Sequence, residues 1–130
     1  MDAKIKLTKT MLDKSIIDAN KTVQKFLLED FGMDYNDEFF TSLWWDDKQL
    51  KFIRTKFVVT GEYIDGTEAK ITFYRTGTRG DKRISIQKLK QYADAGDEVR
   101  LISDSKDVLG GDGLRIFIQV HRPLEDDDAA

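Results

Sequence analysis

One stretch of the chain, residues 74–86, concentrates positive charge between two apolar runs. Its sequence, YRTGTRGDKRISI, carries four cations and one carboxylate: Arg75, Arg79, Lys82, Arg83 and Asp81. Guanidinium groups bind phosphates and guanine edges through paired hydrogen bonds, and a nearby carboxylate can accept from the amino group of cytosine. Gly77 and Gly80 let the backbone approach a partner closely. The stretch therefore has the chemistry of an arm that contacts phosphates and base edges.

The same composition also fits a solvated hairpin tip whose charges only keep the protein soluble. On loop composition alone, this second interpretation is the more common case. Asp81 argues for the first interpretation, because a purely electrostatic phosphate grip has no use for an acidic residue.

A second basic group lies near the N-terminus, in KIKLTKTMLDK, residues 4–14. Lysines and hydroxyl groups contact phosphates, and threonine can also touch the methyl group of thymine. The candidate contact residues are Lys6, Thr8, Lys9, Thr10 and Lys14. An edge strand protected by lysines against aggregation explains the same pattern equally well.

An enzyme is the alternative function. Glu68 and Lys70 form a Glu-x-Lys pair, and Asp46 or Asp47 precedes it, as in many magnesium-dependent nucleases. Such a pair is common by chance on the polar face of a strand. The chain has no cysteine and a single histidine, which excludes disulfides, thiolate metal sites and histidine clusters. We therefore expect no catalytic residue, metal site or cofactor in this chain.

Composition indicates one globular domain. The 130 residues are 40% hydrophobic and 35% charged, with a net charge of −3. Four consecutive carboxylates, residues 125–128, account for that sign, because without them the net charge is +1. We expect a folded domain over residues 1–123 and a disordered acidic tail over 124–130. No apolar run is long enough for a membrane span or a signal peptide, so we expect a cytoplasmic protein with no membrane partner.

The first half of the chain predicts one strand, one helix and then several strands. Residues 4–8 alternate like a short strand. Residues 18–32 predict a helix that Asp18 or Asn20 begins and Gly32 ends, with one apolar face: Ala19, Val23, Phe26, Leu27 and Phe31. Strand-like runs follow at 39–45, 50–64 and 68–76, and Asp65-Gly66 predicts a hairpin turn between the last two.

Alternation assigns faces within these strands. Ala69, Ile71 and Phe73 should face the core, and of the neighbours Trp44 and Trp45 one should enter the core while the other faces outward. A strand at 83–86, a short helix at 85–93 capped by Ser85, and strands at 99–103 and 114–120 complete the prediction. About seven short strands with two helices indicate a mainly β protein of the α+β class that forms a closed or nearly closed barrel.

The order of features over residues 69–103 resembles one family. An aromatic-rich strand, the basic arm, a short helix and the Ala95-Gly96-Asp97-Glu98 turn are similar to the DNA-recognition pseudobarrel of plant transcription factors of the B-three type. The same domain serves restriction endonucleases such as EcoRII and BfiI for effector binding or target recognition. The best match is to the EcoRII arm, which reads Thr-Arg-x-acid-Lys-Arg-Ile: Thr78, Arg79, Gly80, Asp81, Lys82, Arg83 and Ile84.

This resemblance implies a seven-stranded pseudobarrel whose two arms grip the major groove of double-stranded DNA. It assigns Arg79, Asp81, Lys82 and Arg83 to the second arm, whereas the first arm falls only loosely on residues 6–14. Asp81 stands where the EcoRII arm has glutamate, so its side chain is shorter. The implied function is sequence-specific recognition for a restriction endonuclease, with a nuclease domain elsewhere in the full-length chain and no cleavage by this domain itself.

Overall fold

The computed structural model describes residues 2–76, 80–104 and 115–123, in which nine strands and four helices occur. The strands are β1 (Asp2–Lys6), β2 (Ile17–Asp18), β3 (Leu43–Asp46), β4 (Lys51–Arg54), β5 (Phe57–Tyr63), β6 (Glu68–Arg75), β7 (Lys82–Ile86), β8 (Glu98–Asp104) and β9 (Arg115–His121). The helices are α1 (Lys9–Lys14), α2 (Lys21–Phe31), α3 (Glu38–Thr41) and α4 (Leu89–Tyr92).

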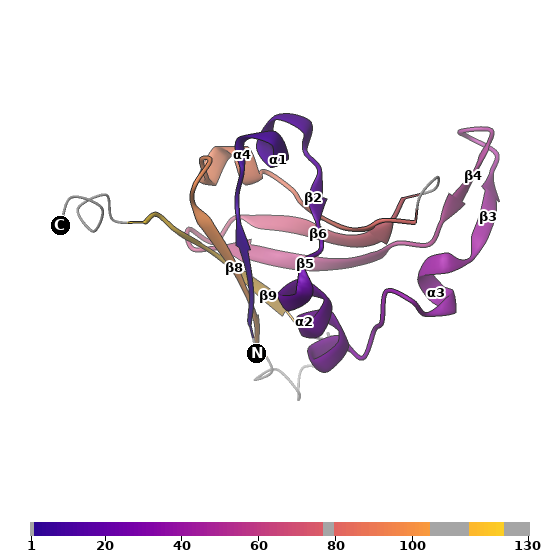
Figure 1. The fold of residues 1–130 in the computed structure, drawn as a ribbon, viewed down its shortest axis with the longest axis horizontal. Helices are drawn as coiled ribbons and strands as arrows, with labels where there is room; N and C mark the ends of the chain where they lie inside the picture. Colours follow the sequence, from indigo (N-terminus) through magenta and orange to yellow (C-terminus); the bar gives the residue numbers. More distant parts are fainter. Residues whose placement is uncertain (1, 77–79, 105–114, 124–130) are drawn as a thin grey trace.

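Seven of the strands form one sheet in the order β1-β8-β9-β5-β6-β7-β2. The sheet curls into a half-barrel, and β3 and β4 pair separately as a hairpin that extends beyond it (Figure 1). The expected mainly β, α+β class is confirmed. Among the described residues, no helix has the length and apolar character needed to cross a membrane.

Helix α2 closes the gap between the two edges of the sheet. β1 and β2 are consecutive in the chain but form opposite edges. The backbone N–H of Lys4 in β1 donates to Thr22 Oγ1 at 3.0 Å, and its carbonyl accepts from Asn20 Nδ2 at 2.8 Å. The start of α2 therefore satisfies backbone groups that an edge strand would otherwise expose to water.

The predicted helix over residues 18–32 is confirmed as α2. Asn20 caps it by accepting from the backbone N–H of Val23 at 2.9 Å, and Gly32 ends it with a φ of 67°. Val23, Phe26 and Leu27 are buried in the hydrophobic core together with side chains of the sheet. The apolar periodicity of this segment thus identified its core face correctly.

The turn and the alternation predicted for residues 57–76 are also confirmed. Asp65 and Gly66 connect β5 to β6, and the backbone N–H of Tyr63 donates to Thr67 O at 2.9 Å to close the turn. The residues predicted to face inward on β6 are fully buried: Ala69, Ile71 and Phe73.

Four local predictions are wrong. The run at 39–45 is not one strand, because residues 38–41 form α3 before β3 begins. The run at 50–64 is not one strand either, because it is divided into β4 and β5. Ser85 does not cap a helix: it belongs to β7, and α4 begins only after Lys88, whose φ is 66°. The first strand runs over residues 2–6 rather than 4–8, and Thr8 instead caps helix α1 by accepting from the backbone N–H of Met11.

The prediction that one of the two tryptophans enters the core is wrong as well. Trp44 and Trp45 are 48% and 47% exposed, and neither belongs to the buried core. Alternation correctly places them on opposite faces, but the β3–β4 hairpin has no second layer on either face within the described residues.

Gly61 tests the packing of the sheet. A Cβ atom there would lie 2.6 Å from Ile71 Cδ1 and 3.0 Å from Ile118 Cδ1, both in the core. We expect Gly61→Ala to lower the free energy of unfolding by about 1–3 kcal/mol, measured by urea denaturation. Thr60→Ala, at the exposed neighbouring position, is the control and should change stability little. Equal midpoints for both variants would contradict this packing.

Candidate nucleic-acid interface

The predicted arm is the connection between β6 and β7, here defined as residues 75–83. Residues 77–79 lie outside the described residues, so the roles predicted for Thr78 and Arg79 stay predictions. The base of the arm is closed by reciprocal hydrogen bonds. The N–H of Thr76 donates to Asp81 O at 3.0 Å, and the N–H of Asp81 donates to Thr76 Oγ1 at 3.0 Å.

Arg75 folds back onto the arm instead of reaching outward. Its Nε donates to Gly80 O at 2.6 Å, and Nη1 lies 3.3 Å from Tyr35 O and from Asn36 Oδ1. A Cβ atom on Gly80 would lie 3.0 Å from Arg75 Nη2, so the absence of a side chain there makes room for the guanidinium. Arg75 therefore braces the arm against the loop that follows α2.

Arg83 is also engaged within the protein. Its Nε lies 3.0 Å from Asp18 Oδ1, an ion pair without hydrogen-bond geometry, and its Nη2 donates to Asp81 Oδ2 at 3.2 Å. The Arg83 side chain is only 18% exposed. Its carbonyl accepts from Tyr35 Oη at 2.8 Å. Burial, with a smaller effect from Tyr74, raises the pKa of Tyr35, so this hydroxyl stays protonated and remains a donor.

Lys82 faces a hollow that it shares with α2. Its Nζ lies 3.4 Å from Gln24 Oε1. The hollow, of about 290 Å³, is lined by Lys21, Gln24, Lys25, Leu28, Asp34, Tyr35, Asn36 and Lys82. Three of these side chains are cations and one is a carboxylate. Asp34 accepts from the backbone N–H of Asn36 at 2.8 Å, and Lys25 pairs only distantly with Glu29, at 3.9 Å. The hollow is therefore a positively charged site beside the arm.

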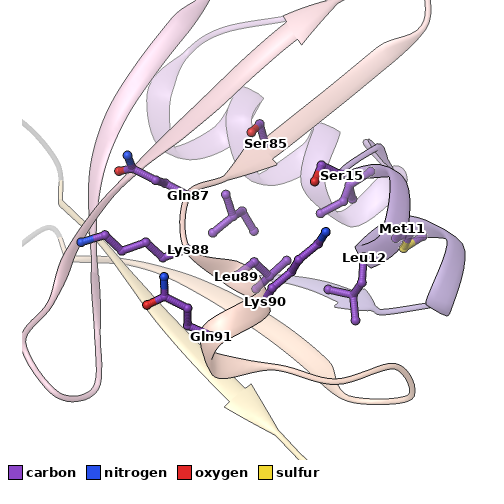
Figure 2. A pocket seen from close by; sticks show the side chains of 11 residues that line it. Met11, Leu12, Ser15, Ser85, Gln87, Lys88, Leu89, Lys90 and Gln91 are labelled. Atoms are coloured by element: carbon purple, nitrogen blue, oxygen red, sulfur yellow. The ribbon is translucent and has the colours of Figure 1, made fainter.

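The N-terminal basic group lies elsewhere. Lys6 ends β1, and Lys9, Thr10 and Lys14 are exposed on α1. Residues of α1 and α4 line one hollow of about 390 Å³, and Figure 2 shows Leu12 and Leu89 among the side chains around it. Lys88, which precedes α4, and Lys90 of α4 also line this hollow. These side chains make a second basic surface, formed by α1 and α4.

The two basic surfaces lie at opposite ends of β7. The arm leads into the first residue of β7, Lys82, whereas α4 follows the last, Ile86. The structure therefore does not bring residues 6–14 together with the arm. Instead it places Lys21 and Lys25 of α2 beside Lys82, a neighbourhood that the sequence patterns did not predict. Their spacing of four residues on the polar face of a predicted helix was the available signal.

The alternative nuclease centre is not assembled. Glu68 begins β6, and Lys70 lies two residues later. Asp46 and Asp47 belong to the β3–β4 hairpin, which is joined to the opposite end of β6 by Arg54, whose Nε donates to Thr76 O at 3.1 Å. No group of three or more carboxylate, histidine or cysteine side chains in the described part of the chain could hold a metal ion. His121, the single histidine of the sequence, is exposed at the end of β9.

Comparisons of the chain with protein-family models, with curated proteins and with solved structures find no match. The resemblance to the pseudobarrel domains therefore rests on the arm and its neighbouring elements in the sequence.

The internal contacts of the arm predict which cations stabilise the fold. Arg83→Ala would leave the carboxylates of Asp18 and Asp81 without their shared cation and remove a mostly buried side chain, so we expect a loss of about 1 kcal/mol in the free energy of unfolding. Lys82→Ala, the neighbouring cation with one long contact, should change it by less than about 0.5 kcal/mol. Urea denaturation measures the stability of both variants. Equal losses would contradict the assignment of Arg83 to the stability of the fold and of Lys82 to contact with a partner.

Proposed function

We propose that this protein binds duplex DNA on the surface formed by the arm and the first half of α2. The observation that carries this proposal is the hollow in which Lys21 and Lys25 of α2 meet Lys82 of the arm. Lysines on a rigid helix and on a strand end contact phosphates as point charges. A sequence-independent electrostatic grip of this kind supplies much of the affinity of proteins for DNA.

The braces of the arm support the same function. Arg75 and Arg83 make hydrogen bonds and ion pairs with the protein at the two ends of the arm, so Asp81 and Lys82 beside them are held in place. Preorganisation lowers the entropic cost of binding. Asp81 is held by Arg83 yet remains 41% exposed, which leaves its carboxylate accessible to a base edge.

The finer proposal is sequence-specific recognition. The resemblance of the arm implies that Arg79 and Asp81 read base edges in the major groove, within the target-recognition or effector-binding part of a restriction endonuclease. In that case a nuclease domain in the same full-length chain cleaves the DNA. The residues predicted for the first arm give a competing location for the phosphate contacts, on α1 at the other end of β7.

Charge-matched lysine variants separate these two locations. We expect Lys21→Ala, Lys25→Ala and Lys82→Ala each to weaken binding to all duplexes and to lower the slope of log affinity against log salt by about one. Lys9→Ala and Lys14→Ala remove the same charge from α1 and serve as controls that should leave the slope unchanged. Fluorescence anisotropy over a salt series measures both. If the α1 variants lower the slope and the α2 variants do not, DNA lies on the α1–α4 surface instead.

Substitution of Asp81 tests whether the arm recognises a specific base. If its carboxylate accepts from a cytosine amino group, Asp81→Ala should relax discrimination at one base pair by about 1–3 kcal/mol without weakening non-specific binding. Asp18→Ala is the matched control, because it removes the other carboxylate that pairs with Arg83 but lies outside the arm. The measurement is competition with single-base-pair changes in a duplex selected from a random pool. Identical specificity profiles for the two variants would mean that Asp81 only positions Arg83.

A further inference from the structure

The β3–β4 hairpin carries the largest group of exposed apolar side chains that the described residues form on one element. Five of its residues are between 47% and 74% exposed: Leu43, Trp44, Trp45, Leu50 and Phe52. Contiguous exposed apolar surface on a soluble protein marks a binding site more often than an accident of composition. An isolated two-stranded hairpin is also only marginally stable in water, so a partner that covers it would stabilise it.

The two faces of the hairpin carry different side chains. Cross-strand partners share a face, and here Leu43 pairs with Arg54 while Trp45 pairs with Phe52. The Trp45 and Phe52 rings form an edge-to-face pair with centroids 5.2 Å apart. We call this the Trp45–Phe52 face. The opposite face carries Trp44, whose partner is Ile53.

Arg54 fixes the direction of the Trp45–Phe52 face. Its side chain donates from Nε to Thr76 O in the arm at 3.1 Å and from Nη1 to Thr41 O in α3 at 2.6 Å. Because Arg54 lies on that face and reaches the arm, the Trp45 and Phe52 rings lie on the arm side of the hairpin. Figure 1 shows the hairpin projecting at the end of the sheet where β6 and β7 meet the arm.

We infer that the Trp45–Phe52 face packs against the same DNA duplex that the arm binds. This inference rests on the proposed function and extends it to a non-electrostatic contact. Aromatic and apolar side chains on a rigid hairpin can wedge against sugars and base edges in a groove. The hydrogen bonds of Arg54 hold the hairpin next to Thr76 at the base of the arm and next to Thr41 in α3, so the hairpin lies where a duplex bound to the arm would pass.

The exposed area favours DNA over a second copy of the chain. An aromatic side chain buries at most about 150–250 Å², so two half-exposed rings offer roughly 200 Å² per copy. Two copies would bury roughly 400 Å² in total, well below the approximately 1,000 Å² or more of total area that a stable dimer interface needs. The same area is a useful addition to a module that already binds DNA through an arm, because such modules bury only about 600–1,000 Å².

The two tryptophans of the chain provide a direct test in the full 130-residue protein. Trp44→Phe leaves Trp45 as the sole tryptophan, and Trp45→Phe leaves Trp44 on the opposite face. On titration with a short duplex of mixed sequence at low salt, we expect the emission of Trp45 to be quenched and that of Trp44 to stay nearly constant. The two variants have the same amino-acid composition. They differ only in the face of the hairpin on which the remaining tryptophan lies.

Affinity gives a second readout that distinguishes an apolar contact from a phosphate contact. We expect Phe52→Ala to weaken binding about tenfold while the salt slope stays unchanged, unlike the lysine variants. Ile53→Ala, the neighbouring position on the Trp44 face, is the control and should bind like the unmodified protein. Circular dichroism of each variant verifies that it is folded.

Each outcome decides the inference. If the duplex binds with the expected lysine dependence but Trp45 emission and Phe52→Ala affinity do not change, the inference is overturned while the proposed function stands. If no duplex binds at low salt, both fail. If Trp45 emission instead depends on protein concentration without DNA, the face pairs with a second copy and the inference is wrong.

Discussion

The segment formed by residues 17–22 holds both edges of the curled sheet, and the arrangement of the candidate site depends on it. On one side Ile17 and Asp18 pair with β7, and on the other Asn20 and Thr22 bind the backbone of Lys4 in β1. A curled sheet with open edges would expose unpaired backbone groups, and this segment satisfies them with very few residues. The same constraint places the first turn of α2 beside Lys82, because β2 pairs with β7 and Asn20 caps α2 only two residues after β2 ends.

The arm shows why a count of charges overestimates the number of contacts available to a partner. Of its cations in the described part of the chain, Arg75 and Arg83 bind carbonyls and carboxylates of the protein itself. A connection between two strands loses conformational entropy when it is ordered, and charge-assisted hydrogen bonds at its base offset that loss. The charge pattern that identified the arm in the sequence therefore includes cations that stabilise the arm itself, and these must be separated from any cation that could contact a partner.

Local patterns predicted local structure well. The caps of α2, the Asp65-Gly66 turn and the inward residues of β6 follow from short-range sterics and hydrogen bonding, and all three are confirmed. What the sequence could not supply is which elements become neighbours. Lysines of α2 meet the arm only because β2 pairs with β7, and two consecutive residues give too weak a signal to predict a strand.

The two neighbouring tryptophans also show that the sequence does not reveal which elements pack against each other. Alternation separates Trp44 from Trp45 into two faces but says nothing about whether a second layer covers either face. Aromatic residues at such density normally indicate a core strand, and here the core is completed without them by α2 and the seven-stranded sheet. The two tryptophans therefore do not contribute to core packing. The hydrogen bonds of Arg54 fix their hairpin beside the arm. The exposure of both tryptophans on this hairpin is better explained by binding to a partner than by stabilisation of the fold.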